Sequence, residues 1–538
     1  MAVEILDTTF RDGAQGGGIR LDELNLEESA EVLSTLDKYA DIIEAGFAGA
    51  SKTIDERFQY FRNIPLERAS LAAFGMTRKP YSDIADARRN RHIRKLEDAA
   101  TPIVTIVGKA SDYHVLHALN TDLEENLRMN YDTIRYFSEM GKRVIFDAEL
   151  ITTAMLGIGE EGGRNQFLWK PNMDYALKVL AKAAEAGSDT LVLCDTTGVL
   201  PVERVEELMI IVMREFGNLK IGFHGHGDSD LATANTMLAI RHGAKHAQAV
   251  ANGYGERIGN TNLFSLLVNL SSPYSQLADV FSGLETMTQD AQRIHYLATG
   301  EYRLEKASGV GTQAFFHKGG MHGHAMEHAV RAYEGRDLDF FGNTRVFPVS
   351  QQGGISHIAQ FFGLKRDDPL VKIINERRQE EETRGMDFEF APASLYVLGK
   401  RCDSHYQRPF EVKDAKVVDE WDEGKQRIVG SMDVIVAGEL KSIKRVEGRG
   451  QVDALTNALK TGLGETYSAN QLRLYDFRVH IVPGQNPDTS QTVRVEAFWA
   501  TNGQKFVTMG ISYDIVRASM DAIIDGIEYN LRLPNKMH

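Results

Sequence analysis

Eight short apolar runs in the first half of the chain constrain its fold more than any other feature. Each run has the length of a β-strand, and longer amphipathic stretches such as 26–39 and 173–187 lie between the runs. A run that is apolar throughout suits a strand covered on both faces, as in a parallel sheet enclosed by helices. The runs are residues 3–8, 41–46, 70–75, 102–107, 143–149, 190–195, 220–226 and 247–252.

This succession of strand and helix repeats eight times before residue 275, which favours a TIM (β/α)8 barrel over an open, doubly wound sheet. An open sheet remains an alternative because the strand sequences alone do not show closure. The active sites of such barrels lie at the carboxyl ends of the strands. Polar residues gather at those ends here: Arg11, Asp12, Glu44, Glu149, Asp195, Thr196, His224, His226 and residues 256–260.

The stretch FHGHGDSD, residues 223–230, ends the seventh run on two histidines. Side chains two residues apart on a strand project from the same face, so His224 and His226 are expected to point together into the barrel mouth. Two imidazoles in that arrangement form half of a metal shell. The alternative is that one histidine packs in the core and the other is hydrogen-bonded.

Oxygen ligands would complete this metal site. Asp12 and the side-chain amide of Asn260 follow neighbouring strands, and a mixed nitrogen and oxygen set suits a divalent Mn, Mg, Zn or Co ion with open positions for substrate. Asp228 and Asp230 are alternative ligands. We expect them instead to start the next helix, where acidic residues are favourable.

Five motifs in the same order make the chain resemble the DRE-TIM metallolyases. Within that group it is similar to the 2-isopropylmalate, homocitrate and citramalate synthase family. The likeness runs nearly end to end, and residues 472–531 resemble the family's C-terminal regulatory domain. The motifs are DTTFRDGAQ (7–15), LVLCDTTG (191–198), HGHGDSDLATANT (224–236), NGYGERIGN (252–260) and FFHKGGMH (315–322).

The resemblance implies roles for individual residues. By position, the family's metal ligands fall on Asp12, His224, His226 and Asn260. Its substrate-binding residues fall on Arg11, Gln15 and Thr196, where Arg11 holds the keto oxygen and Thr196 the carboxylate of a 2-oxo acid. Its catalytic residues fall on Arg11, Glu149, His322 and Tyr333.

The resemblance also implies the reaction, a Claisen-type condensation of acetyl-CoA with a 2-oxo acid. We expect pyruvate as the 2-oxo acid and (R)-citramalate and CoA as the products, on the isoleucine route of branched-chain amino-acid biosynthesis. The chemistry needs a Lewis acid for the ketone, a base for the methyl proton of acetyl-CoA and a cation for the developing oxyanion. The metal, His322 or Glu149, and Arg11 meet those needs.

Three alternatives stay open. The chain could form 2-isopropylmalate or another alkylmalate, it could cleave a carbon–carbon bond as a metal-dependent lyase, or it could be a non-catalytic amino-acid sensor. The intact metal set and Arg11 argue against the sensor.

Some positions depart from the family pattern. Phe10 stands where leucine is usual, Gly227 where asparagine is usual, and Leu150 with the loop 151–170 replaces a histidine and a shorter loop. Because that loop lies at the predicted mouth, it bears on the identity of the 2-oxo acid. We expect a small apolar pocket, lined in part by Phe74 and Ile106.

The pattern of the chain predicts three parts. Residues 1–275 form the catalytic barrel, 276–391 helical linker subdomains, and 392–538 a C-terminal α+β regulatory domain. Within the last part, strands followed by a helix occur twice, which indicates an internal duplication. Such a pair is used in the family to dimerise and to bind an end product, so a homodimer with an amino-acid effector is expected.

Composition limits the environment and the partners. A net charge of −14, without a basic block, argues against a nucleic-acid partner. The two cysteines, Cys194 and Cys402, do not form a disulfide scaffold and suit a reducing compartment. Neither a signal sequence nor an apolar run of spanning length occurs, so no membrane association and a cytoplasmic location are expected.

Overall fold

A computed structural model describes residues 3–532, apart from 87, 158–170, 273–282, 302, 318–320, 323–324, 326–328, 330, 344–353, 423–424, 465–471, 483–490 and 502–503. The chain divides into two compact units. The first comprises Met1–Phe315 with Glu334–Arg345, and the second Phe316–Tyr333 with Val346–His538. The three-part division at residues 275 and 391 stays a prediction.

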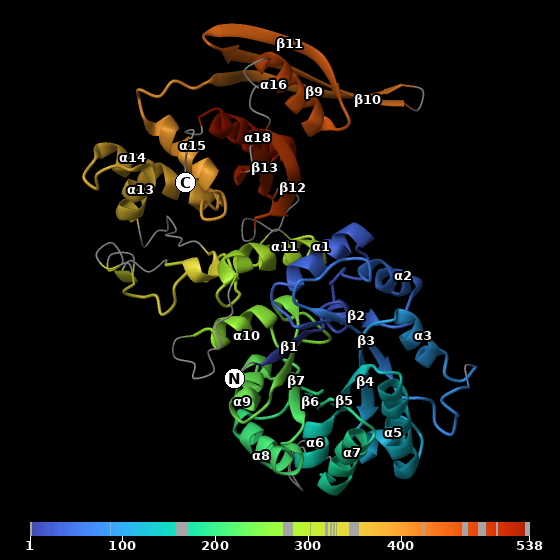
Figure 1. Cartoon of the computed structure of the whole chain (residues 1–538). Coiled ribbons are helices and arrows are strands. Elements are labelled where there is room, and N and C mark those ends of the chain that lie inside the picture. The colour runs from blue at the N-terminus through green and yellow to red at the C-terminus, as the bar shows by residue number, and fades with distance from the viewer. Residues whose placement is uncertain are drawn as a thin grey trace. The chain divides into compact units, whose positions relative to one another are not determined.

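Eight parallel strands of the first unit form a closed barrel in sequence order (Figure 1). The first strand pairs with the second and also with the eighth, so that Leu6 lies between Ile42 and Gln248. The predicted TIM barrel is confirmed, and the open sheet is excluded. The strands are β1 Glu4–Asp7, β2 Ile42–Phe47, β3 Ser70–Met76, β4 Ile103–Lys109, β5 Arg143–Glu149, β6 Thr190–Asp195, β7 Lys220–Gly225 and β8 His246–Ala249.

Helices surround the barrel and cover the outer faces of its strands (Figure 1). The first helix begins with a capping box, in which the side chains of Asn25 and Glu28 each accept the other's backbone N–H. The helices of this unit are α1 Leu26–Leu36, α2 Lys52–Phe61, α3 Arg91–Ala99, α4 Asp112–His117, α5 Leu123–Glu139, α6 Ile151–Leu156, α7 Met173–Glu185, α8 Val205–Phe216, α9 Ala232–Arg241, α10 Leu263–Leu270 and α11 Met287–Thr299.

The inside of the barrel is layered. At the amino-terminal end of the strands, Glu4 accepts hydrogen bonds from Arg143, Lys220 and His246 at 2.6–3.2 Å. The next layer is apolar, and only the layer above it, at the carboxyl ends, carries the predicted site residues. The apolar layer consists of Leu6, Ile42, Ala72, Ile103, Ile145, Val192 and Cys194.

The second unit contains two similar strand–helix repeats, as the sequence predicted. Each repeat is an antiparallel three-stranded sheet followed by a helix, and both repeats contribute to one apolar core that includes Leu459 and Trp499. Among the described helices, none is both long and apolar enough to span a membrane. The elements are α13 Gly354–Phe362, α14 Pro369–Arg384, α15 Pro392–Cys402, β9 Phe410–Asp422, β10 Lys425–Val436, β11 Glu439–Gly448, α16 Gln451–Leu463, β12 Arg473–Ile481, β13 Val493–Thr501, β14 Gln504–Ser512 and α18 Ile515–Arg532.

The barrel interior offers a stability test at Gly222 of β7. A Cβ atom there would lie 2.7 Å from the ring of His246 and 3.1 Å from a methyl group of Val192, both closer than ordinary contacts. We predict that Gly222→Ala lowers the free energy of unfolding by about 1–3 kcal/mol through overpacking. Gly17→Ala is the matched control, because no atom lies within 4 Å of its Cβ position. Thermal unfolding measures both, and equal midpoints for the two variants would contradict this packing.

Candidate metal centre at the barrel mouth

The turn after β1 places Asp12 over the barrel. The backbone carbonyl of Thr8 accepts hydrogen bonds from the N–H groups of Arg11, Asp12 and Gly13. The hydroxyl of Thr9 donates to the carboxylate of Asp7 at 2.8 Å and accepts the N–H of Ala251 at 2.9 Å. These bonds tie the turn to the chain that follows β8, so the position of Asp12 depends on barrel closure.

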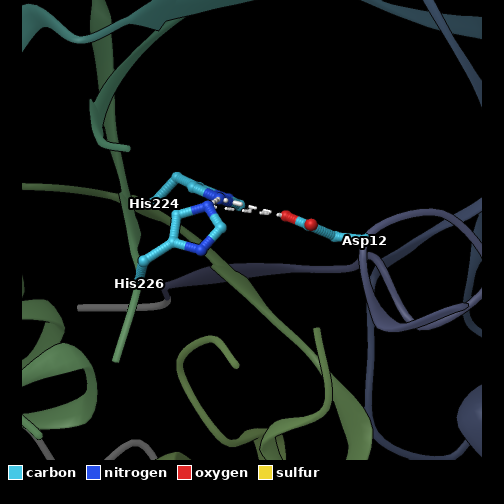
Figure 2. Close-up of side chains that lie close together, drawn as sticks. All are labelled: Asp12, His224 and His226. Atoms are coloured by element: carbon cyan, nitrogen blue, oxygen red, sulfur yellow. Dashed lines mark hydrogen bonds and ion pairs between the residues drawn. The ribbon is translucent and has the colours of Figure 1, made fainter. Parts of the chain in front are cut away.

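His224 and His226 lie opposite this turn, at the end of β7. Figure 2 shows their rings directed toward the carboxylate of Asp12. The Nε2 atoms of the two histidines are 3.2 Å apart, and they lie 3.3 and 3.9 Å from Oδ2 of Asp12. All three residues are buried, with relative exposures of 3–6%. One potential ligand atom from each lies within 4.8 Å of the others, a spacing that suits a single metal ion.

The protonation of the histidines is consistent with metal binding. Nδ1–H of His224 donates to Oε1 of Gln248 at 2.7 Å, which leaves the lone pair of Nε2 directed at Asp12. Burial and the neighbouring His224 lower the pKa of His226 from 6.5 to about 3, so this imidazole is neutral at neutral pH. Burial alone would raise the pKa of Asp12, but Arg11 and His224 outweigh it and hold that pKa below its ordinary value.

Asn260 lies beside the same three residues. Its side-chain Nδ2 is 2.8 Å from Oδ2 of Asp12 and 3.2 Å from Nε2 of His224, whereas its Oδ1 is buried without a hydrogen-bond partner. The amide packs against Gly255, which has a φ of +144°, and a Cβ there would lie 2.0 Å from Oδ1. A glycine is therefore required for Asn260 to reach the centre.

The residues present fit a divalent metal ion. Two imidazole nitrogens, one carboxylate and one amide oxygen are a common donor set for such ions. The oxygen of Asn260 has no hydrogen-bond partner among the described residues and lies on the side of Gly255, so the amide would turn to bring this oxygen to an ion. The described part of the chain therefore holds a potential metal centre at the carboxyl ends of β1 and β7.

Arg11 adds a buried cation beside this centre. Its guanidinium contacts Asp12 at 3.0 Å and Glu44 at 2.8 Å, lies 3.9 Å from Asp147, and stacks 4.2 Å from the ring centre of Phe74. One nitrogen, Nη2, is buried and has no hydrogen-bond partner among the described residues. A substrate oxygen could accept from that nitrogen.

The remaining predicted residues of the barrel lie at its rim. Thr196 follows β6, and its hydroxyl oxygen accepts the backbone N–H of Leu150 at 2.9 Å. Glu149 ends β5 and forms an ion pair with Lys109, its neighbour on β4. Gln15 is exposed. The structure thus brings Thr196 and Glu149 to the mouth, whereas Gln15 contacts the centre through its backbone, whose N–H donates to the carbonyl of Asp12 at 3.0 Å.

His322 and Tyr333 belong to the second unit. Their rings stack with centroids 3.9 Å apart and an interplanar angle of 16°, and both residues are exposed. The ring centroid of His317 lies 6.3 Å from that of His322. These two predicted catalytic residues are therefore in mutual contact.

Two structural predictions were wrong. Ile106 does not face the barrel mouth. It pairs with Gly75 of β3, whose Cβ position points at Leu96 of α3, so this level of the two strands faces the surrounding helices. Ile106 accordingly packs in the same outer core as Leu96. Neither Asp228 nor Asp230 starts the next helix, which begins at Ala232 after the N-cap Leu231. Asp228 forms an ion pair with Arg257 at 2.7 Å instead.

The replaced loop starts differently from the prediction. Residues 151–156 of the predicted loop form the buried helix α6, whose preceding residue Leu150 has a left-handed φ of 61°. The remainder, 158–170, lies outside the described residues. Phe74 faces the centre as expected, since it contacts Arg11.

Sequence reasoning missed two residues next to the centre, Gln248 and Asp147. Gln248 of β8 accepts from His224 and donates to Asp147 of β5 at 2.7 Å. Burial and the nearby carboxylate of Glu44 raise the pKa of Asp147 to about 7. Both residues lie inside apolar runs. A polar residue within such a run was the sequence signal that could have identified them.

Comparisons with known proteins agree with this architecture. Residues 2–286 match the HMGL-like family, and residues 389–531 match the LeuA allosteric (dimerisation) domain. The chain is 33% identical to an (R)-citramalate synthase of Sulfolobus acidocaldarius, over 99% of this chain and 97% of the relative. An (R)-citramalate synthase of Synechocystis sp. is 34% identical, over 98% and 96% of the two chains.

The chain belongs to the (R)-citramalate synthase family. A 2-isopropylmalate synthase of Methanocaldococcus jannaschii covers 98% of the chain but is only 26% identical. The higher identity to the citramalate synthases confirms the resemblance drawn from the five motifs.

The metal centre predicts a specific binding defect. Asp12→Asn and His226→Ala each remove a predicted ligand. Loss of a residue that only hydrogen-bonds to a ligand typically weakens metal binding about 10–100-fold, so each of these variants should weaken it by more than that. Asp228→Asn is the matched control, because Asp228 pairs with Arg257 outside the centre. Elemental analysis after dialysis measures the bound metal. Full occupancy in a His224→Ala/His226→Ala protein would refute the site.

Proposed function

We propose that the protein condenses acetyl-CoA with pyruvate to give (R)-citramalate and CoA. The observation that carries this proposal is the 33% identity to an (R)-citramalate synthase over 99% of the chain, together with the clustering of Asp12, His224 and His226. A divalent metal held by these residues and Asn260 supplies a Lewis acid that polarises the ketone of the 2-oxo acid.

The chain's own groups carry out the other parts of the reaction. The free Nη2 of Arg11 donates to the ketone oxygen as it gains negative charge, and the ion pair with Glu44 holds the guanidinium in place. The backbone N–H of Leu150 occupies a lone pair of the Thr196 hydroxyl, so the hydroxyl hydrogen is available to the substrate carboxylate.

We propose His322 or Glu149 as the base that takes the methyl proton of acetyl-CoA. Glu149 is at the barrel mouth, where it forms an ion pair with Lys109. Stacking on Tyr333 restricts the imidazole of His322. Hydrolysis of the CoA thioester then makes the condensation irreversible.

The substrate is tested by release of free CoA thiol in the presence of different 2-oxo acids. Pyruvate should give a kcat/KM about 10–200-fold above that of 2-oxoisovalerate, because two added methyl groups must fit beside the stacked side chains of Phe74 and Arg11. A preference for 2-oxoisovalerate would replace this proposal with 2-isopropylmalate synthesis. Cleavage of citramalate without any thiol release would indicate a lyase.

The second unit supports a further part of the proposal, a homodimer regulated by an amino acid. A cavity of about 330 Å³ lies between β9, α16 and α18. Val412, Leu455 and Met520 contribute apolar surface, and Arg517 and Asp521 contribute opposite charges. This combination suits an amino acid with an aliphatic side chain, such as isoleucine or leucine, and the family match names the region an allosteric dimerisation domain.

The effector proposal predicts a selective loss of inhibition. Arg517→Gln removes one of the two cations, Arg517 and Lys413, that line the cavity and could bind the effector carboxylate. The isoleucine or leucine concentration for half inhibition should then rise at least about tenfold, corresponding to one charge-assisted hydrogen bond. Arg473→Gln, on exposed β12, is the control. Titrations of both variants provide the measurement, and unchanged inhibition in Arg517→Gln would place the effector elsewhere.

A further inference from the structure

Five side chains form a closed ring around the top of the barrel. Asp12 contacts His224 at 3.3 Å, His224 donates to Gln248 at 2.7 Å, and Gln248 donates to Asp147 at 2.7 Å. Asp147 lies 3.9 Å from Arg11, which returns to Asp12 at 3.0 Å. The ring joins the turn after β1 to β7, β8 and β5, and it connects the metal centre with the proposed oxyanion site.

Gln248 is the only uncharged amide in this ring of five side chains, and it is fully buried. It lies in the four-residue strand β8 with a relative exposure of 1%, and burying an amide costs free energy unless its polar atoms have partners. Both ends are partnered, since Oε1 accepts from His224 and Nε2 donates to Asp147. In its ionised form the carboxylate of Asp147 accepts only from the NH₂ end of the amide, and the oxygen faces His224.

This orientation determines the state of His224. An amide oxygen opposite Nδ1 requires that Nδ1 carries the hydrogen, so Nε2 presents its lone pair toward Asp12 and His226. An amide turned the other way would place an NH₂ group against Nδ1, favour the wrong tautomer and block the ligand lone pair. The orientation of one amide therefore decides whether His224 can bind a metal.

We propose that Gln248, oriented by Asp147, is a positioning residue that holds His224 in its metal-binding tautomer and ties it to the frame of Arg11. The inference rests on the metal centre of the proposed function. It adds that metal affinity depends on residues of β8 and β5 that do not themselves contact the metal.

The test is a titration of the full-length metal-free protein with Co²⁺, followed by the visible absorption of the bound ion. Gln248→Met preserves length and volume but offers no strong acceptor to Nδ1, so the Kd for Co²⁺ should rise about 10–100-fold. Gln248→Glu restores an oxygen opposite Nδ1 and should recover most of this loss. Gln292→Met is the matched control. Gln292 lies in α11 and makes three hydrogen bonds to the backbone of Leu304 and Val310, away from the ring. The Kd of this variant for Co²⁺ should stay within about twofold of that of the parent.

Asp147 is tested in the same way. Asp147→Ala leaves the amide free to turn and should weaken binding in the same direction as Gln248→Met. Circular dichroism of each variant establishes that the barrel is folded.

The outcomes separate this inference from the proposed function. If the parent binds Co²⁺ and Gln248→Met binds it within twofold of the parent, or if Gln248→Glu is as weak as Gln248→Met, the positioning role is refuted and the metal centre stands. If the parent itself does not bind Co²⁺, the centre and the inference both fail. A steady-state assay adds a second readout, in which Gln248→Met lowers kcat at subsaturating metal but recovers it at high metal.

Discussion

The pairing of β1 with β8 is the interaction on which the rest of the structure depends. It sets Leu6 opposite Gln248 and Asp7 opposite Ala249, and it continues as the hydrogen bond from the N–H of Ala251 to the hydroxyl of Thr9. Through this closure Asp12 and Asn260, which are 248 residues apart, lie within 2.8 Å of each other. An open sheet with the same strands would separate them by the width of the sheet.

Barrel closure also brings several charged side chains together in a buried site. Asp12, Glu44 and Asp147 surround the single guanidinium of Arg11, and all four are buried or nearly so. Three carboxyl groups around one guanidinium are an arrangement whose negative charge a divalent cation would reduce. Burial, together with the nearby carboxylate of Glu44, raises the pKa of Asp147 to about 7. The same buried side chains therefore form the potential metal centre and connect β1, β2 and β5 at the barrel mouth.

The barrel was largely predictable because each strand is an apolar run with its own turn signals. The clustering of Asp12, His224, His226 and Asn260 followed from the rule that carboxyl ends of parallel strands share one edge. The direction of individual side chains was less predictable. Ile106 faces the helices because the pleat of β4 places it outward, and a run that is apolar on both faces does not reveal which residues point inward.

Other features depend on tertiary context that the sequence does not display. The pairing of Asp147 with Gln248 joins residues 101 positions apart, and neither residue stands in a motif. Leu150 adopts a left-handed conformation that its residue type disfavours, and its N–H then reaches Thr196. The ion pair of Lys109 and Glu149 follows from the register of β4 and β5 alone.

The central claim is that barrel closure builds one metal centre from Asp12, His224, His226 and Asn260. Anomalous diffraction at the cobalt absorption edge, from crystals of the full-length protein soaked with Co²⁺, tests it most directly. The account predicts one strong peak about 2.0–2.3 Å from a carboxylate oxygen of Asp12 and from Nε2 of both histidines, with the Asn260 oxygen turned toward it. A peak bound by Asp228 or by other residues, with none between Asp12 and His224, would contradict the account.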